Sequence, residues 1–113
     1  MCIRDRRKEA AWALGMIESP DGVAPLLPLL ADASPALRKE AAWALGMIES
    51  SEAVEALGRA YGAEENPQVR AELIWALGMI EDRAGAETIV DALEDADPGV
   101  REKALWAIGM VMD

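Results

Sequence analysis

The sequence predicts an all-α solenoid of stacked antiparallel helical hairpins with about seven helices. One reason is an internal repeat: residues 7–19 and 38–50 are identical, and looser copies occupy residues 70–82 and 101–113. A second reason is the period, because successive tryptophans are 31, 32 and 31 residues apart. These tryptophans are Trp12, Trp43, Trp75 and Trp106. A fixed period of about 20–50 residues is typical of stacked units that share one continuous core.

The third reason is a recurring helix-start motif, a capping residue followed by proline. A cap side chain accepts a hydrogen bond from a free backbone N–H group, and proline fits the first helical position. The motif occurs at Ser19-Pro20, Ser34-Pro35, Asn66-Pro67 and Asp97-Pro98. No stretch alternates with a period of two, so no strand is expected. The expected helices cover residues 7–17, 20–31, 35–48, 51–61, 83–94 and 98–111, with a further long helix starting at residue 67.

Helical spacing also predicts which side chains form the core. Steps of about 100° per residue place one apolar stripe on each helix. The stripe of the long helix at 35–48 consists of Leu37, Ala41, Ala44, Leu45 and Ile48. The stripe of the short helix at 20–31 consists of Val23, Leu26, Leu27 and Leu30.

Two irregularities interrupt the regular pattern of the repeats. Pro28 lies inside the helix expected at 20–31 and has no amide hydrogen, so we expect a bend there. The single extra residue of the 32-residue step lies between Tyr61 and Asn66. We expect it to lengthen the loop at residues 62–65, because surface connections tolerate insertions.

Residues 1–6 do not fit the repeat and resemble the translated end of a sequencing-transposon adapter. Arg6 falls where the later repeats carry an apolar anchor such as Leu37. Our hypothesis is that the chain comes from a metagenomic sequence, that residues 1–6 are a non-native scar, and that Cys2 has no biological role. An irregular native N-terminus is the alternative. The remaining residues then form one domain, with a half repeat at 7–17 and repeats at 18–48, 49–80 and 81–113.

Composition restricts the classes of partner. The chain has 113 residues, enough for one domain, and a formal net charge of −10. Such an acidic balance argues against binding to nucleic acid and to anionic membranes, and it favours a basic or amphipathic protein or peptide. No apolar run approaches the length of about 18 residues that a membrane span needs. A single cysteine cannot form an internal disulfide, so we expect a cytoplasmic protein.

The pattern Asp-x-x-Pro-x-Val-Arg-x-x-Ala-Ala-x-Ala-Leu-Gly-x-Ile resembles the bilin-lyase type of HEAT-like repeat. Residues 32–48, 64–80 and 95–111 match most of it, and the resemblance extends over residues 7–113. Departures include Leu73-Ile74 and Ala104-Leu105 in place of Ala-Ala, and Glu64 in place of Asp. Families with this repeat include bilin lyase subunits, a di-iron hydroxylase, scaffolds, adaptors and a designed binder library. The resemblance therefore implies the fold more specifically than the function.

The resemblance also implies a ladder of ion pairs between neighbouring repeats. The Asp and Arg of the motif are six residues apart, and here the pairs would be Asp32/Arg38, Glu64/Arg70 and Asp95/Arg101. The implied role is structural. Being exposed, each pair is expected to contribute less than about 1 kcal/mol to stability.

The candidate binding site is a repeated set of side chains on one flank of the long helices, which we call the Trp–Met stripe. Tryptophan supplies a large contact area and methionine adapts to irregular partners. In the resembling family, the long helices line the concave side and these positions vary between binders. The stripe consists of Glu9, Trp12, Met16, Lys39, Glu40, Trp43, Met47, Glu72, Trp75, Met79, Lys103, Trp106 and Met110.

A structural interpretation of the same tryptophans stands beside the functional one. Each ring could pack over the small Ala42-type side of the next long helix, and repeat copying would then explain the recurrence. The helical glycines 15, 46, 78 and 109 are expected to allow close approach of a neighbouring helix, at a cost of about 1 kcal/mol of helix propensity each.

Catalysis, cofactors and metals find no support in the sequence. The chain has no histidine, so the metal motifs of the hydroxylase relatives and histidine-based nucleophile activation are both missing. The leading prediction is a non-catalytic protein- or peptide-binding scaffold that uses its concave face. The alternatives are an accessory subunit of a bilin lyase-type system and a consensus-type design. End-to-end self-association is also expected, because Trp12 and Met16 at one end and Trp106, Met110 and Met112 at the other are apolar.

Overall fold

The computed structural model describes residues 3–112, with side-chain burial from Arg6 onward. Cys2 lies outside these residues. Seven α-helices and four short 3-10 turns, with no strand, make up the described chain. In order they are α1 (Ile3–Ile17), η1 (Pro20–Gly22), α2 (Val23–Leu26), η2 (Leu27–Ala31), α3 (Pro35–Ile48), η3 (Ser51–Ala53), α4 (Val54–Ala63), α5 (Pro67–Ile80), η4 (Arg83–Gly85), α6 (Ala86–Ala92) and α7 (Pro98–Met112).

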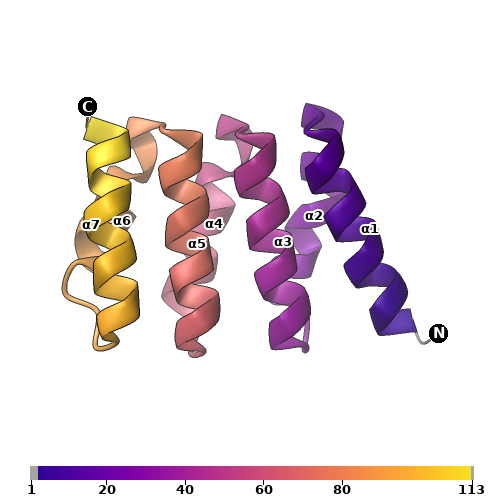
Figure 1. Cartoon of the computed structure of the whole chain (residues 1–113), viewed down its shortest axis with the longest axis horizontal. Helices are drawn as coiled ribbons and strands as arrows, with labels where there is room; N and C mark the ends of the chain where they lie inside the picture. The colour runs from indigo at the N-terminus through magenta and orange to yellow at the C-terminus, as the bar shows by residue number, and fades with distance from the viewer. Residues whose placement is uncertain (1–2, 113) are drawn as a thin grey trace.

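The helices form two layers, which confirms the predicted α-solenoid (Figure 1). The long helices α1, α3, α5 and α7 lie side by side in one layer, and α2, α4 and α6 lie behind them. Neighbouring long helices make the most extensive contacts in the chain, whereas the short helices mainly contact the long ones. The whole array measures 39 × 27 × 18 Å.

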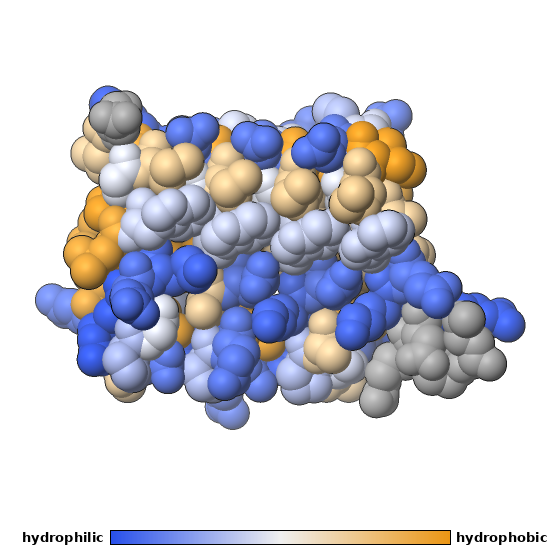
Figure 2. Space-filling model, in the orientation of Figure 1, coloured by the Kyte–Doolittle hydropathy of each residue, from blue (hydrophilic) through white to orange (hydrophobic). Residues whose placement is uncertain are grey.

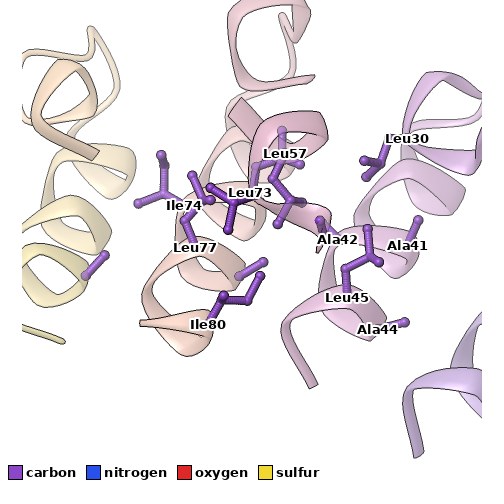
Figure 3. Packing of buried hydrophobic residues seen from close by; sticks show 14 of the residues in the cluster. Leu30, Ala41, Ala42, Ala44, Leu45, Leu57, Leu73, Ile74, Leu77 and Ile80 are labelled. Carbon is purple, nitrogen blue, oxygen red and sulfur yellow. The ribbon is translucent and has the colours of Figure 1, made fainter. Parts of the chain in front are cut away.

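The core lies between the two layers and matches the predicted apolar stripes (Figure 3). All five core residues predicted for α3 are buried, and Figure 3 labels Ala41, Ala44 and Leu45 among them. In the first short segment Val23, Leu26 and Leu30 are buried, whereas Leu27 is only partly buried. Leu57 from α4 and Leu73 and Leu77 from α5 continue this core into the next repeat, each no more than 1% exposed. At about 25 cal/mol per Å² of apolar surface, such burial is the main stabilising contribution to the fold.

The predicted caps start the long helices. The Ser34 hydroxyl accepts a hydrogen bond from the Leu37 amide at 3.4 Å. Asn66 Oδ1 accepts from the Gln68 amide at 2.9 Å, and Asp97 Oδ2 accepts from the Val100 amide at 3.1 Å. These bonds satisfy N–H groups that have no partner within the helix. Their repetition sets the start of three successive long helices at matching positions.

Each of the first three long helices ends in the same way, which the sequence analysis did not anticipate. Glu18, Glu49 and Glu81 adopt the left-handed conformation, with φ of 58°, 57° and 57°. After a helix, this conformation is usually adopted by glycine, because a Cβ atom is sterically crowded there. Because this left-handed glutamate recurs at the same position after each of these helices, it is a constant feature of the turn that follows them.

Several boundaries differ from the predictions. The helices expected from residues 51 and 83 begin as the 3-10 turns η3 and η4, and α6 ends at Ala92, before the predicted residue 94. The helix expected at 20–31 is α-helical only over Val23–Leu26 and continues as 3-10 turns, because Pro28 cannot donate the α-helical hydrogen bond. Helix α4 extends through Ala63, where a loop had been expected, although Gly62 has a low helix propensity. Helix α1 starts at Ile3, before the predicted residue 7. The adapter hypothesis concerns the origin of those residues and stays a hypothesis.

The end faces of the described array expose apolar side chains. Ile17 is 67% exposed, whereas Ile48 and Ile80 at the same repeat position are 8% and 9% exposed. Leu105 on α7 is 65% exposed, whereas its counterpart Ile74 is fully buried. End-to-end self-association therefore remains a prediction, and light scattering over a range of concentrations would test it.

Candidate protein-interaction surface

The Trp–Met stripe runs across the long-helix layer. The charged residue, the tryptophan and the methionine of each helix are three and four residues apart, which places them on one side at successive turns. Figure 2 shows this face: weakly polar and apolar side chains form two adjacent rows across the four long helices, and a strongly hydrophilic band lies beside them. The stripe is therefore one surface that repeats along the array.

The tryptophans also pack between helices, on the glycines of the preceding long helix. A Cβ added at Gly15 would lie 2.7 Å from Cζ3 of Trp43. The same addition at Gly46 would lie 2.6 Å from Cζ3 of Trp75, and at Gly78 it would lie 2.6 Å from Cζ3 of Trp106. Only a residue without a side chain leaves room for the ring edge. The predicted close-approach role is confirmed for these three glycines. It is wrong for Gly109, because no atom lies within 4 Å of a Cβ added there.

The direction of this packing differs from the expected one. The structural interpretation placed each ring over the alanine side of the next long helix. In the structure, the ring reaches back to the preceding helix, because the glycine there offers a deeper recess than an alanine would. Ala42, in contrast, is fully buried in the core.

Packing leaves part of each stripe residue accessible. Trp43 and Trp75 are partly buried, as are Met47 and Met79. Trp12 and Met16 are each 52% exposed, and Trp106 is 39% exposed. A tryptophan can be held by its ring edge and still present a face to a partner. The packing and binding interpretations are thus compatible at Trp43 and Trp75.

Four of the predicted residues meet at a hollow of about 370 Å³ on this face. Its lining consists of Lys8, Ala36, Lys39, Glu40, Trp43 and Glu72. Lys39, Glu40, Trp43 and Glu72 were predicted, whereas Lys8 and Ala36 were missed. Lys8 is the repeat counterpart of Lys39, 31 residues earlier, so extending that column by one repeat would have found it.

The other stripe residues lie outside this hollow. They continue the face along and beside it, and the structure does not gather them into one cavity. These residues are Glu9, Trp12, Met16, Met47, Trp75, Met79, Lys103, Trp106 and Met110.

Glu72 is the electrostatically unusual residue of the hollow. Burial raises the pKa of its carboxyl group, and the nearby Glu40 raises this pKa further. Lys39 and Lys103 act in the opposite direction. The carboxylate of Glu72 is therefore poorly solvated for an ionised group, and an additional cation at the hollow would favour its charged form.

The arginine ladder is present, but its acidic partners come from the following repeat. Arg38 Nε lies 2.6 Å from Glu64 Oε1, and Arg70 Nε lies 3.1 Å from Asp95 Oδ2. Towards its own repeat, Arg38 donates to the backbone carbonyl of Asp32 at 2.7 Å. The within-repeat carboxylate pairs Asp32/Arg38, Glu64/Arg70 and Asp95/Arg101 are thus corrected to Arg7–Asp32, Arg38–Glu64 and Arg70–Asp95.

The second and third pairs of the ladder are also more buried than expected, whereas Arg7 of the first pair is 51% exposed. The side chains of Arg38 and Glu64 are 19% and 5% exposed. The hydrogen bond to Glu64 raises the pKa of the Arg38 guanidinium group. Burial alone would raise the pKa of Glu64, but the bonds from Arg38 and from the Asn66 amide lower it overall. Partners this shielded from water interact more strongly than exposed surface pairs.

Residues 3–112 contain neither a membrane-spanning helix nor a cluster of potential metal ligands. No helix in that range is long and apolar enough to cross a membrane. Within the same residues, no three or more Cys, Asp or Glu side chains gather in a way that could hold a metal ion.

Comparison with known proteins identifies the repeat. The family model for HEAT repeats matches residues 4–65 and 59–113. No curated protein sequence matches the chain.

Several solved structures are similar in fold. Human deoxyhypusine hydroxylase in complex with glycerol superposes with a TM-score of 0.81 at 27% sequence identity, over 96% of this chain and 43% of that one. Two engineered proteins superpose with TM-scores of 0.63 and 0.62 at 28% and 30% identity. The matches cover 94% and 93% of this chain, and 34% and 56% of theirs. The chain thus spans about a third to just over half of the length of these structures.

Proposed function

Because this chain belongs to the HEAT-repeat family, we propose that it is a non-catalytic scaffold that binds a protein or peptide segment along its long-helix face. The observation that carries the proposal is the hollow at Trp43, where an accessible aromatic ring lies beside Lys39, Glu40 and Glu72. Aromatic anchors next to charged groups are common at the energetic centres of interfaces. We do not propose the hydroxylase activity for this chain, because its sequence has no histidine for the metal motifs of those relatives.

A basic, amphipathic segment suits this surface best. An apolar anchor of the partner would cover the accessible part of Trp43 and contact the neighbouring methionines, which adapt to irregular shapes. Its cations would approach Glu40 and Glu72. The net charge of −10 would speed the encounter with a positively charged partner, more strongly at low salt.

The more specific role suggested by the sequence resemblance, an accessory subunit of a bilin lyase-type system, remains an alternative. It predicts that a linear tetrapyrrole binds to the chain and changes its visible absorbance. A titration without any spectral change would argue against that role.

The test uses a defined probe, a synthetic amphipathic helix of lysine and leucine, with a glutamate–leucine peptide as its matched control. Binding is followed by the indole N–H resonance of Trp43 in two-dimensional NMR and by calorimetry. We expect the lysine peptide to bind and to shift the Trp43 resonance, and the glutamate peptide not to bind. The double variant Glu40→Gln/Glu72→Gln should weaken binding by roughly five- to tenfold.

The control variant is Glu52→Gln/Glu87→Gln, which removes the same charge from two exposed sites on η3 and α6. Equal weakening by both double variants would show that net charge acts alone and would contradict a specific site. Alanine in place of Trp43 and Trp75 is a poorer test than the charge variants. Both rings fill the recesses above Gly15 and Gly46, so their loss would also destabilise the fold.

A further inference from the structure

A second hollow lies at the short-helix layer, between η2 and α4. It has a volume of about 630 Å³, and its apolar lining includes Leu27, Leu30 and Ala60. Arg38 and Glu64, the ladder pair of this junction, also line it. We call it the η2–α4 groove. It is separate from the Trp–Met stripe, because the two hollows share no lining residue.

The next junction of the solenoid carries a tyrosine at the corresponding place. Tyr61 occupies the repeat position of Leu30, 31 residues later. Its side chain is partly buried, and its hydroxyl donates a hydrogen bond to Asp95 Oδ2 at 2.5 Å. Asp95 is the ladder carboxylate of that junction, as Glu64 is of the first. The chain therefore shows how a phenol fits beside a ladder carboxylate.

The two carboxylates differ by one hydrogen bond. Asp95 Oδ2 accepts from both Tyr61 Oη and Arg70 Nε, and Oδ1 accepts from Arg70 Nη2 and the Asp97 amide. Glu64 Oε2 likewise accepts from Arg38 Nη2 and the Asn66 amide. Glu64 Oε1, however, accepts only from Arg38 Nε among the described residues. Each carboxylate oxygen can accept two bonds, so Glu64 has room for the donor that Tyr61 supplies to Asp95.

We propose that the η2–α4 groove binds the unmodified tyrosine side chain of a partner protein, with its hydroxyl donating to Glu64 Oε1. The ring would lie on Leu30 and Ala60, and at the next junction Tyr61 itself stands at the repeat position of Leu30. The groove is large enough, since a cavity of about 150 Å³ accommodates benzene. A phenylalanine would fill the same space without satisfying Glu64.

The charges of the groove favour the unmodified phenol over its phosphate ester. Arg38 is already bound to Glu64 and to two backbone carbonyls, and Arg59 pairs with Glu55. A phosphate would meet Asp32, Glu64 and Glu65 at close range. Phosphorylation of the partner tyrosine would therefore prevent binding.

The experiment titrates the full chain with N-acetyltyrosine amide, with the phenylalanine and phosphotyrosine amides as controls. Amide resonances of residues 56–65 report on the groove. We expect the tyrosine amide to shift them, to bind about tenfold more tightly than the phenylalanine amide because of the charged hydrogen bond, and the phosphotyrosine amide not to bind. Equal affinity for the tyrosine and phenylalanine amides would overturn the assignment to Glu64, and resonances that do not move would overturn the site.

Two variants locate the site within the fold. Leu30→Tyr places the phenol inside the groove, so it should abolish binding of the tyrosine amide. Tyr61→Leu should open an equivalent groove beside Asp95 and add a second set of shifts at residues 88–97. Unchanged binding in Leu30→Tyr, or a single site in Tyr61→Leu, would contradict the proposal, and each variant tests it even if the other does not fold.

Discussion

At the junction between α3 and α5, Arg38 holds Glu64 and a groove stays open beside Leu30. At the junction between α5 and α7, Arg70 holds Asp95 and Tyr61 adds its hydroxyl to the same carboxylate. On the long-helix side, the two junctions are alike, with a tryptophan edge on a glycine in each case. The long-helix layer thus packs in the same way from repeat to repeat. The short-helix layer varies, because Leu30 lines an open groove at one junction and Tyr61 bonds to the ladder carboxylate at the next.

The largest effect is expected where the two junctions are alike. Gly46→Ala would place a Cβ 2.6 Å from Trp75 Cζ3 and 3.0 Å from the backbone of Ala76, and Gly78→Ala would do the same against Trp106. Each should lower the free energy of unfolding by about 3 kcal/mol, as measured by urea denaturation.

Gly109→Ala is the matched control, because nothing lies within 4 Å of its added Cβ. There, helix propensity should raise stability by up to about 1 kcal/mol. Equal effects at all three glycines would disprove the packing account.

The ladder carboxylates come next, with Glu64→Gln and Asp95→Asn each costing about 2 kcal/mol near neutral pH through the lost charged hydrogen bonds. Burial opposes the ionisation of Asp95, but the bonds from Tyr61, Arg70 and the Asp97 amide lower its pKa overall, and the pKa of Glu64 is also lowered. A pKa lower in the folded chain stabilises it above the unfolded pKa, and this stability is lost as the pH falls through the folded value.

The wild type should therefore lose stability as the pH drops below the ordinary carboxyl range, and each variant should lose less over the same interval. Chemical denaturation at several pH values measures both slopes. Parallel slopes for variant and wild type would show that the carboxylate does not contribute to the pH dependence.

Tyr61→Phe isolates the bond that distinguishes the second junction. It keeps the ring and removes one donor to a charged acceptor, so it should cost about 1 kcal/mol. The effect should shrink strongly in an Asp95→Asn background, because the two side chains act as a pair. A double-mutant cycle by urea denaturation measures this coupling, and strict additivity would contradict it.

The smallest effect is expected at Glu72, between the two junctions. Its pKa is raised, chiefly by burial, so ionisation of this carboxyl group opposes folding once the pH exceeds the unfolded pKa. Glu72→Gln should increase stability at neutral pH by a few tenths of a kcal/mol, with a smaller difference at mildly acidic pH. Thermal unfolding at the two pH values would show it, and a destabilised variant would mean that the attraction to Lys39 and Lys103 outweighs burial.

The repeat period and the cap-proline pairs predicted the fold almost completely. They located every long helix, and helical spacing identified the core residues of α3. The 3-10 conformation of η2 and the extension of α4 to Ala63 were not predicted. Both depend on which backbone hydrogen bonds form around Pro28 and around residues 62–63.

The candidate site was predicted only in part. A single helix repeat shows which side chains share a flank, and this placed Lys39, Glu40 and Trp43 correctly together. It does not show which neighbouring helix a ring contacts, so the contact between Trp43 and Gly15 was not predicted. The ladder partners were misassigned for the same reason, because contact between repeats depends on their stacking offset. The η2–α4 groove was not predicted, because it depends on how η2 and α4 pack beside each other.

Tyr61 is the single tyrosine of the chain, which makes the second junction optically distinct. Burial, with the hydrogen bond to Asp95, raises the pKa of its hydroxyl well above the ordinary value of 10.0. In alkaline solution somewhat above that value, an intact junction keeps the phenol protonated, whereas an opened one releases the proton and gains tyrosinate absorbance. The alkaline absorbance of an unlabelled sample would therefore report whether Tyr61 of α4 stays in contact with Asp95, in the connection between α6 and α7.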